Sequence, residues 1–185
     1  MKTYEDTLKE ATQSVQWGNE DIEIYYQFLQ LAKPTGFTIC PVYSHQGDNN
    51  YYSRYDLIQL KIDDDNKYSI IPQFIELKGR NDYSYTQFDS ARIDLSKVEE
   101  LQEYGKTNNM DVFIVNIWKK DNNAITIHKL DLDKQYNWTW VYANKQTADT
   151  KGRVEKIEKK MVDLPFSEGK IYPLWYLNKQ KICHN

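Results

Sequence analysis

A carboxylate and an ammonium group stand two residues apart at the end of an apolar stretch, in Phe74-Ile75-Glu76-Leu77-Lys78. In a β-strand, residues i and i+2 project from the same face. We therefore expect Glu76 and Lys78 to project together from the end of a buried strand, where a rigid sheet can hold reacting groups. An ordinary surface ion pair is the alternative, because Glu-x-Lys also occurs often by chance.

A second acid, Asp56, opens the preceding apolar run, and the turn-forming residues 63–66 separate the two runs. A hairpin through this turn would bring Asp56 and Glu76 side by side. Two adjacent carboxylates repel each other unless a cation lies between them or one takes a proton. Mg²⁺ prefers oxygen ligands and keeps water molecules for chemistry. The sequence therefore predicts a magnesium site, with Lys78 placed to hold or help deprotonate an attacking water.

The elements that must position these groups follow from hydrophobic spacing and turn residues. We predict a helix capped by Asn19 and a second helix that Gly105 ends, with a capping box at 96–99. The predicted order is helix 19–33, strands 37–43, 55–62 and 68–78, helix 94–104, and strands 112–118 and 124–130. A helix between the third and fourth strands permits a parallel crossover, so we expect an α/β fold with a central mixed β-sheet flanked by helices.

The rest of the chain, 131–185, is harder to interpret. Residues 138–143 form a possible strand, 151–160 form a charged stretch, and 171–175 suggest a packed tail. At 185 residues the chain has the size of one domain. We expect a single domain over 1–185, with a core at about 19–130 and a C-terminal elaboration at 131–185.

The motif Asp-(hairpin)-Glu-x-Lys, between two helices, resembles the PD-(D/E)xK nuclease superfamily, which includes restriction-endonuclease-like and Holliday-junction-resolvase-like proteins. The resemblance covers roughly residues 19–130 and depends on Arg54-Tyr55-Asp56 and on Ile75-Glu76-Leu77-Lys78-Gly79-Arg80. Tyr55 stands where the motif has proline, at a position that varies in the family. The resemblance implies a restriction-endonuclease-like core in which Asp56, Glu76 and the backbone carbonyl of Leu77 bind the metal, and Lys78 is the catalytic lysine.

The same resemblance implies further site residues. Some such nucleases add an acid from the first helix, for which Asp21 is the better candidate because it lies on the inward face, and Glu20 is the second. Both acids also suit the first turn of a helix for electrostatic reasons alone. Lys97 on the second helix is a candidate for contact with the scissile phosphate, or an ordinary solvated lysine. Arg80 and Arg92 are candidates for contact with the nucleic-acid backbone, although exposed arginines are common.

Composition narrows the remaining possibilities. The formal net charge is −3, which is unlike many nucleic-acid-binding proteins unless bound divalent cations reverse the local field. The two cysteines and three histidines show no zinc-binding spacing, and no glycine-rich loop to hold phosphate is present. With no apolar run of membrane-spanning length, we expect a soluble, cytoplasmic protein.

The function we expect is an Mg²⁺-dependent deoxyribonuclease, an endonuclease rather than an exonuclease, with Mn²⁺ able to substitute and DNA as the partner. A homodimer is possible, because cutting two strands usually needs two centres. One alternative is a nucleic-acid- or protein-binding module that keeps this fold without turnover. Another is an interaction protein whose aromatic segment 138–175 binds a partner, but that hypothesis leaves the grouping of Asp56, Glu76 and Lys78 unexplained.

Overall fold

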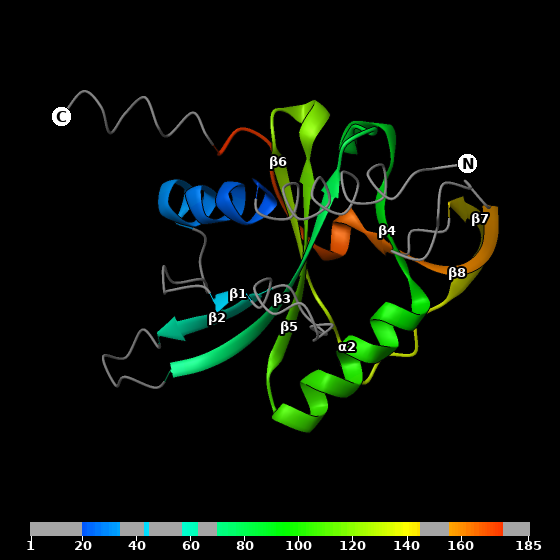
Figure 1. Ribbon diagram of the computed structural model, residues 1–185, viewed down its shortest axis with the longest axis horizontal. Coiled ribbons are helices and arrows are strands. Elements are labelled where there is room, and N and C mark those ends of the chain that lie inside the picture. The colour runs from blue at the N-terminus through cyan, green and yellow to red at the C-terminus, as the bar shows by residue number, and fades with distance from the viewer. Residues whose placement is uncertain (1–19, 34–42, 45–56, 63–69, 145–155, 176–185) are drawn as a thin grey trace, which may run out of the picture.

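The computed structural model describes residues 20–33, 43–44, 57–62, 70–144 and 156–175. In this part of the chain, two β-sheets and two helices form a mixed α/β fold (Figure 1). Asn19, the predicted turn 63–66 and most of the predicted strand 37–43 lie outside the described residues.

The larger sheet contains six strands in the order β1-β2-β3-β5-β6-β9. Its strands are β1 (Tyr43–Ser44), β2 (Leu57–Ile62), β3 (Ile70–Arg80), β5 (Asp111–Trp118), β6 (Ala124–Lys129) and β9 (Lys170–Tyr172). β3 and β5 are parallel, and every other neighbouring pair is antiparallel. The predicted mixed sheet is therefore confirmed, including the antiparallel pairing of β2 with β3.

A smaller antiparallel sheet contains three strands in the order β4-β8-β7. Its strands are β4 (Ser90–Asp94), β7 (Trp138–Asn144) and β8 (Lys156–Pro165), and three short 3-10 turns follow β3, β5 and β8 at Tyr85–Gln87, Lys119–Asp121 and Phe166–Glu168. Sequence analysis missed β4 and placed a charged stretch where β8 begins. The first half of β8 carries charged side chains, so its strand character depends on pairing with neighbours and not on alternating hydrophobicity.

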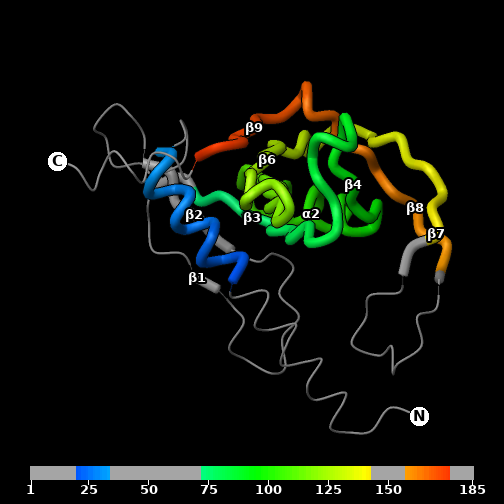
Figure 2. Tube along the Cα trace, turned by 90° about the horizontal axis from the view of Figure 1, so that it is seen from above, coloured from blue at the N-terminus to red at the C-terminus, as the bar shows by residue number. Residues whose placement is uncertain are grey.

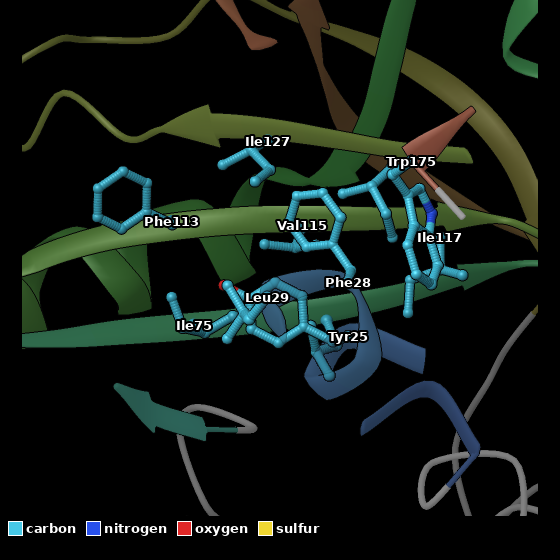
Figure 3. Packing of buried hydrophobic residues seen from close by; sticks show 11 residues of the cluster. Tyr25, Phe28, Leu29, Ile75, Phe113, Val115, Ile117, Ile127 and Trp175 are labelled. Carbon is cyan, nitrogen blue, oxygen red and sulfur yellow. The ribbon is translucent and has the colours of Figure 1, made fainter. Parts of the chain in front are cut away.

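One face of the larger sheet is covered by a helix over residues 20–32 (Figure 1). Tyr25, Phe28 and Leu29 are its fully buried residues and recur at the predicted helical spacing. They pack against Ile75 and against Trp175 from the C-terminal part of the chain (Figure 3). Trp175 therefore packs in the same core as the first helix.

The opposite face is covered by α2 (Leu95–Asn108). Val98 and Leu101 of α2 are fully buried in a second cluster with Phe74 of β3 and with Val162 and Leu164 of β8. The helix thus packs against strands of both sheets, and β8 and β7 lie at the end of the molecule away from helix 20–32 (Figure 2). Alternate residues of β3 consequently face different helices, with Ile75 and Leu77 toward helix 20–32 and Phe74 toward α2.

The structure confirms the predicted start of α2 near Asp94 but corrects its predicted capping box and its predicted end. Its N-cap is Asp94, whose carboxylate accepts a hydrogen bond from the Ser96 backbone N–H at 3.1 Å, so the capping box predicted at 96–99 is wrong. The helix also continues through Gly105 to Asn108, and its C-cap is Asn109, which has the left-handed conformation (φ 52°). Asparagine tolerates this conformation, whereas Gly105 serves a packing requirement.

That requirement gives a test at Gly105. A Cβ atom there would lie 2.7 Å from Cγ2 of Val112 and 2.9 Å from Cδ2 of Leu132. We expect Gly105→Ala to lower the free energy of unfolding by about 1–3 kcal/mol through overpacking, despite the gain of about 1 kcal/mol in helix propensity. Urea unfolding measures this change, and Lys106→Ala in the same turn is the exposed control. A stabilised Gly105→Ala variant would show that α2 and β5 are not in close contact.

Candidate active site

Glu76 of β3 lies between two lysine side chains. Lys78 Nζ is 2.5 Å from Oε1 of Glu76, and Lys97 Nζ is 3.4 Å from its Oε2. Lys97 also lies 3.7 Å from the carboxylate of Glu100, one turn further along α2. The structure therefore brings together three of the residues expected at the site: Glu76, Lys78 and Lys97.

Strand and helix geometry explain this grouping. Glu76 and Lys78 lie two residues apart in β3 and so project from the same face, which is the face that α2 covers. Lys97 is the third residue of α2, whose start is fixed by the Asp94 cap. A side chain in the first turn of α2 therefore reaches the end of β3.

Burial makes Glu76 the unusual member of the group. Its side chain is 3% exposed, whereas Lys78 is 35% and Lys97 is 23% exposed. A buried carboxylate requires positive charge or hydrogen-bond donors around it, because burial otherwise destabilises the anion. Here two ammonium groups supply that charge, one at each oxygen. A hard divalent cation is a second source of the same charge, so the oxygen donors at this position fit Mg²⁺ chemically.

Asp56, the other predicted ligand, lies outside the described residues. Its neighbour Leu57 is the first residue of β2 and pairs with Ile75, the residue that precedes Glu76. Among the described residues, no group of three or more His, Cys, Asp or Glu side chains is arranged to hold a metal ion.

The first-helix acids take a different position from the three clustered residues. Asp21 Oδ1 lies 2.7 Å from Lys119 Nζ, and Glu20 Oε2 lies 3.3 Å from the same atom. A Cβ atom on Gly79 would lie against the Asp21 carboxylate, so Asp21 is on the face that helix 20–32 covers, opposite Glu76. Burial raises the pKa of Asp21 above its ordinary value, although the contact with Lys119 opposes this shift.

Arg80 is held within the protein by several hydrogen bonds. Its Nε and Nη2 donate to Oδ1 of Asn116 at 3.0 and 2.8 Å, and Nη2 also donates to the Arg92 backbone carbonyl at 2.5 Å. The guanidinium lies 5.9 Å from the ring centroid of Trp118, and burial lowers the pKa of Arg80 to about 10. These contacts give Arg80 a role in joining β3 to β5 and β4.

Arg92 lies in β4 and forms a two-point contact across to β8. Its Nε and Nη2 donate to the two carboxylate oxygens of Asp163 at 2.7 and 3.2 Å. The hydrogen bond to Asp163 raises the pKa of Arg92 further above its ordinary value. With its side chain 48% exposed, Arg92 combines this cross-strand pairing with access to solvent.

Sequence analysis missed Lys119 and Asn116. Both come from β5 or the turn after it, and β5 runs parallel to β3. The carboxyl ends of parallel strands meet at one edge of a sheet, so the basic run Lys119-Lys120 after an apolar strand was a usable signal. Asn116 was detectable as the one polar residue inside a run of seven otherwise apolar residues, 112–118.

The described residues contain no helix with both the length and the apolar character needed to cross a lipid bilayer. No protein-family model matches this chain, and no match was found among curated protein sequences. Any proposal for the function of this protein is therefore argued from the geometry around Glu76.

Proposed function

We propose that this protein is an Mg²⁺-dependent nuclease with a restriction-endonuclease-like core that hydrolyses phosphodiester bonds in DNA. The observation that carries the proposal is the buried Glu76 carboxylate with Lys78 and Lys97 at its two oxygens. A carboxylate and two ammonium groups near the C-terminal end of a central strand form a site where a cation and a phosphate can both be bound.

The order of elements supports this proposal. A helix precedes three antiparallel strands, α2 follows, and β5 is parallel to β3. The PD-(D/E)xK family that the sequence resembles has the same order of helix, three strands, helix and strand. The insertion of β4 between β3 and α2 is an addition to that order.

The proposed metal ligands are Asp56, Glu76 and the backbone carbonyl of Leu77. Leu57, the first residue of β2, pairs with Ile75, the residue before Glu76. This pairing supports the choice of the Asp56 and Glu76 carboxylates as ligands of one ion. When bound, Mg²⁺ would supply the charge that activates a water molecule and stabilises the leaving oxygen.

The two lysines have different proposed roles. Lys78 lies beside Glu76 on the same strand face, so it can orient the attacking water and take part in proton transfer at that water. Lys97 approaches from α2 on the other carboxylate oxygen, so it can bind a non-bridging phosphate oxygen and offset its charge. A substrate phosphate would then replace part of the carboxylate contact that each ammonium group now makes.

Incubation with supercoiled, linear and branched DNA in Mg²⁺ or Mn²⁺ tests the proposal. We expect cleavage that chelation stops and that Asp56→Ala and Lys78→Ala each reduce by about 10²–10⁴-fold, because a metal ligand or a proton-transfer group is lost. Lys129→Ala is the matched control, since Lys129 is exposed at the end of β6 and contacts Asp111 instead.

Two outcomes would overturn the proposal. Equal cleavage by Asp56→Ala, Lys78→Ala and the parent protein would mean that these residues do not form the reacting centre. Binding of DNA without cleavage in any divalent metal would indicate a binding module that keeps the fold without turnover.

A further inference from the structure

Three large aromatic side chains project from one face of β7. Trp138, Trp140 and Tyr142 occupy alternate positions of this strand and are 41%, 58% and 70% exposed. Single exposed aromatic residues are common on proteins, but three in a row on one strand face form a continuous stripe. We call these three residues the aromatic stripe. β7, which carries the stripe, lies at the outer position of the order β4-β8-β7 and at one side of the molecule (Figure 2).

A lysine from the neighbouring strand lies over this stripe. Lys160 of β8 is paired with Trp140, and its Nζ is 4.3 Å from the Trp138 ring centroid and 5.5 Å from the Trp140 ring centroid. At the far end of the stripe Tyr142 is paired with Glu158. The stripe therefore combines exposed aromatic rings with a cation at the two tryptophans and an acid at the tyrosine.

Charge in this part of the sequence differs from that of the chain as a whole. Residues 138–144 and 156–160, which are the described residues of β7 and the first half of β8, contain three lysines and one acidic residue, a net charge of +2, whereas the whole chain has a net charge of −3. A negatively charged polymer would thus be attracted to this segment and repelled by the remainder. Charge complementarity and aromatic rings together favour a nucleic acid over an apolar protein surface.

The spacing of the rings favours a single strand over a duplex. The centroids of the Trp138 and Trp140 rings lie 5.5 Å apart, and the two ring planes are nearly perpendicular. Bases in a duplex strand are about 3.4 Å apart and are stacked on one another. Only bases that have left such a stack can present their faces to protein rings.

We propose that the aromatic stripe binds single-stranded DNA, with unstacked bases on Trp138 and Trp140 and the phosphate backbone near Lys160. The proposal deepens the nuclease function and rests on it for the choice of DNA. It assigns to the smaller sheet the task of holding an unpaired strand, separate from the residues around Glu76. A substrate with both paired and unpaired parts would then be favoured over plain duplex.

Fluorescence anisotropy of a labelled 20-nucleotide oligo(dT), measured with the full chain in EDTA, tests this binding without cleavage. We expect Trp140→Ala to weaken binding about 5- to 150-fold, the effect of losing one stacked base, and Trp140→Phe to retain most of it. Tyr26→Ala is the matched control, because Tyr26 is an exposed aromatic residue (39%) on helix 20–32. Lys160→Ala should reduce the slope of log K against log salt by about 0.7.

Three results would overturn the proposal: no binding of oligo(dT) at low salt, equal binding by Trp140→Ala and the parent, or tighter binding of duplex than of single strand. If the edge of β7 pairs with a protein strand instead of binding DNA, oligo(dT) will not bind, which is the first of these results. The nuclease proposal fails separately, because it is judged by cleavage in Mg²⁺, whereas stripe binding is judged in EDTA. Cleavage without stripe binding, or stripe binding without cleavage, therefore identifies which proposal is wrong.

Discussion

Glu76→Gln is expected to abolish DNA cleavage while leaving the protein about as stable as before. Cleavage should fall by at least about 100-fold, because the amide cannot replace an anionic metal ligand. Stability should change by about 1 kcal/mol or less, because the buried anion is removed and the two partly exposed lysines can turn toward water. If Glu76 served folding alone, Glu76→Gln would lower stability and leave cleavage unchanged.

Replacing the two lysines instead of the carboxylate gives a second test of the cluster. Replacing both Lys78 and Lys97 by Met leaves Glu76 buried with neither ammonium group at its oxygens, which we expect to cost about 3–5 kcal/mol. Adding Glu76→Gln to that double variant should recover most of the loss, a coupling that urea unfolding in EDTA measures directly. A large loss of stability in Glu76→Gln alone would mean that the cluster is structural.

The second large effect is expected at Phe28, in helix 20–32. Its ring is fully buried, and its centroid lies 5.0 Å from that of Tyr172 of β9. The same centroid lies 5.7 Å from that of Trp175 (Figure 3). We expect Phe28→Ala to lower the free energy of unfolding by about 3–5 kcal/mol, since the lost contacts join the first helix to the C-terminal strand. Tyr26→Ala, on the exposed side of the same helix, should cost far less. Similar losses in both variants would show that helix 20–32 does not pack through this face.

Helix 20–32 and the strands β2, β3, β5 and β6 were predictable because each carries its own signal, whereas the short strand β9 was not predicted. The first helix shows helical spacing, residues 112–118 form a continuous apolar run, and residues 55–62 and 68–78 are rich in β-branched and aromatic residues. β4 and β8 lacked such a signal, because only Ala91, Ile93, Val162 and Leu164 of them enter the core and most of their other residues are polar or charged. Strands of this kind are specified by cross-strand pairing, which a single sequence does not reveal.

The site was predictable to the extent that it depends on local geometry. The i, i+2 spacing of Glu76 and Lys78 places them together in any strand, and this contact is observed. The contact of Lys97 with Glu76 depends on where α2 begins, and the pairing of Asp21 with Lys119 depends on the parallel order of β3 and β5. Such contacts between distant segments follow from the fold as a whole. The contacts of Arg80 were not predictable for the same reason, since its guanidinium donates hydrogen bonds to Asn116 on another strand.

Asp94 is both the last residue of β4 and the cap of α2, and it is paired with Met161 and lies 3.0 Å from Lys159 Nζ, both in β8. Lys97 lies only three residues after Asp94. The contacts of Asp94 with β8 therefore help to position the first turn of α2, and with it the Lys97 side chain. During synthesis on the ribosome the Glu76 cluster can therefore assemble fully only after residue 161 has emerged. A nascent chain that ends before residue 161 would lack the cluster's third member, which delays the proposed activity until β8 has been made.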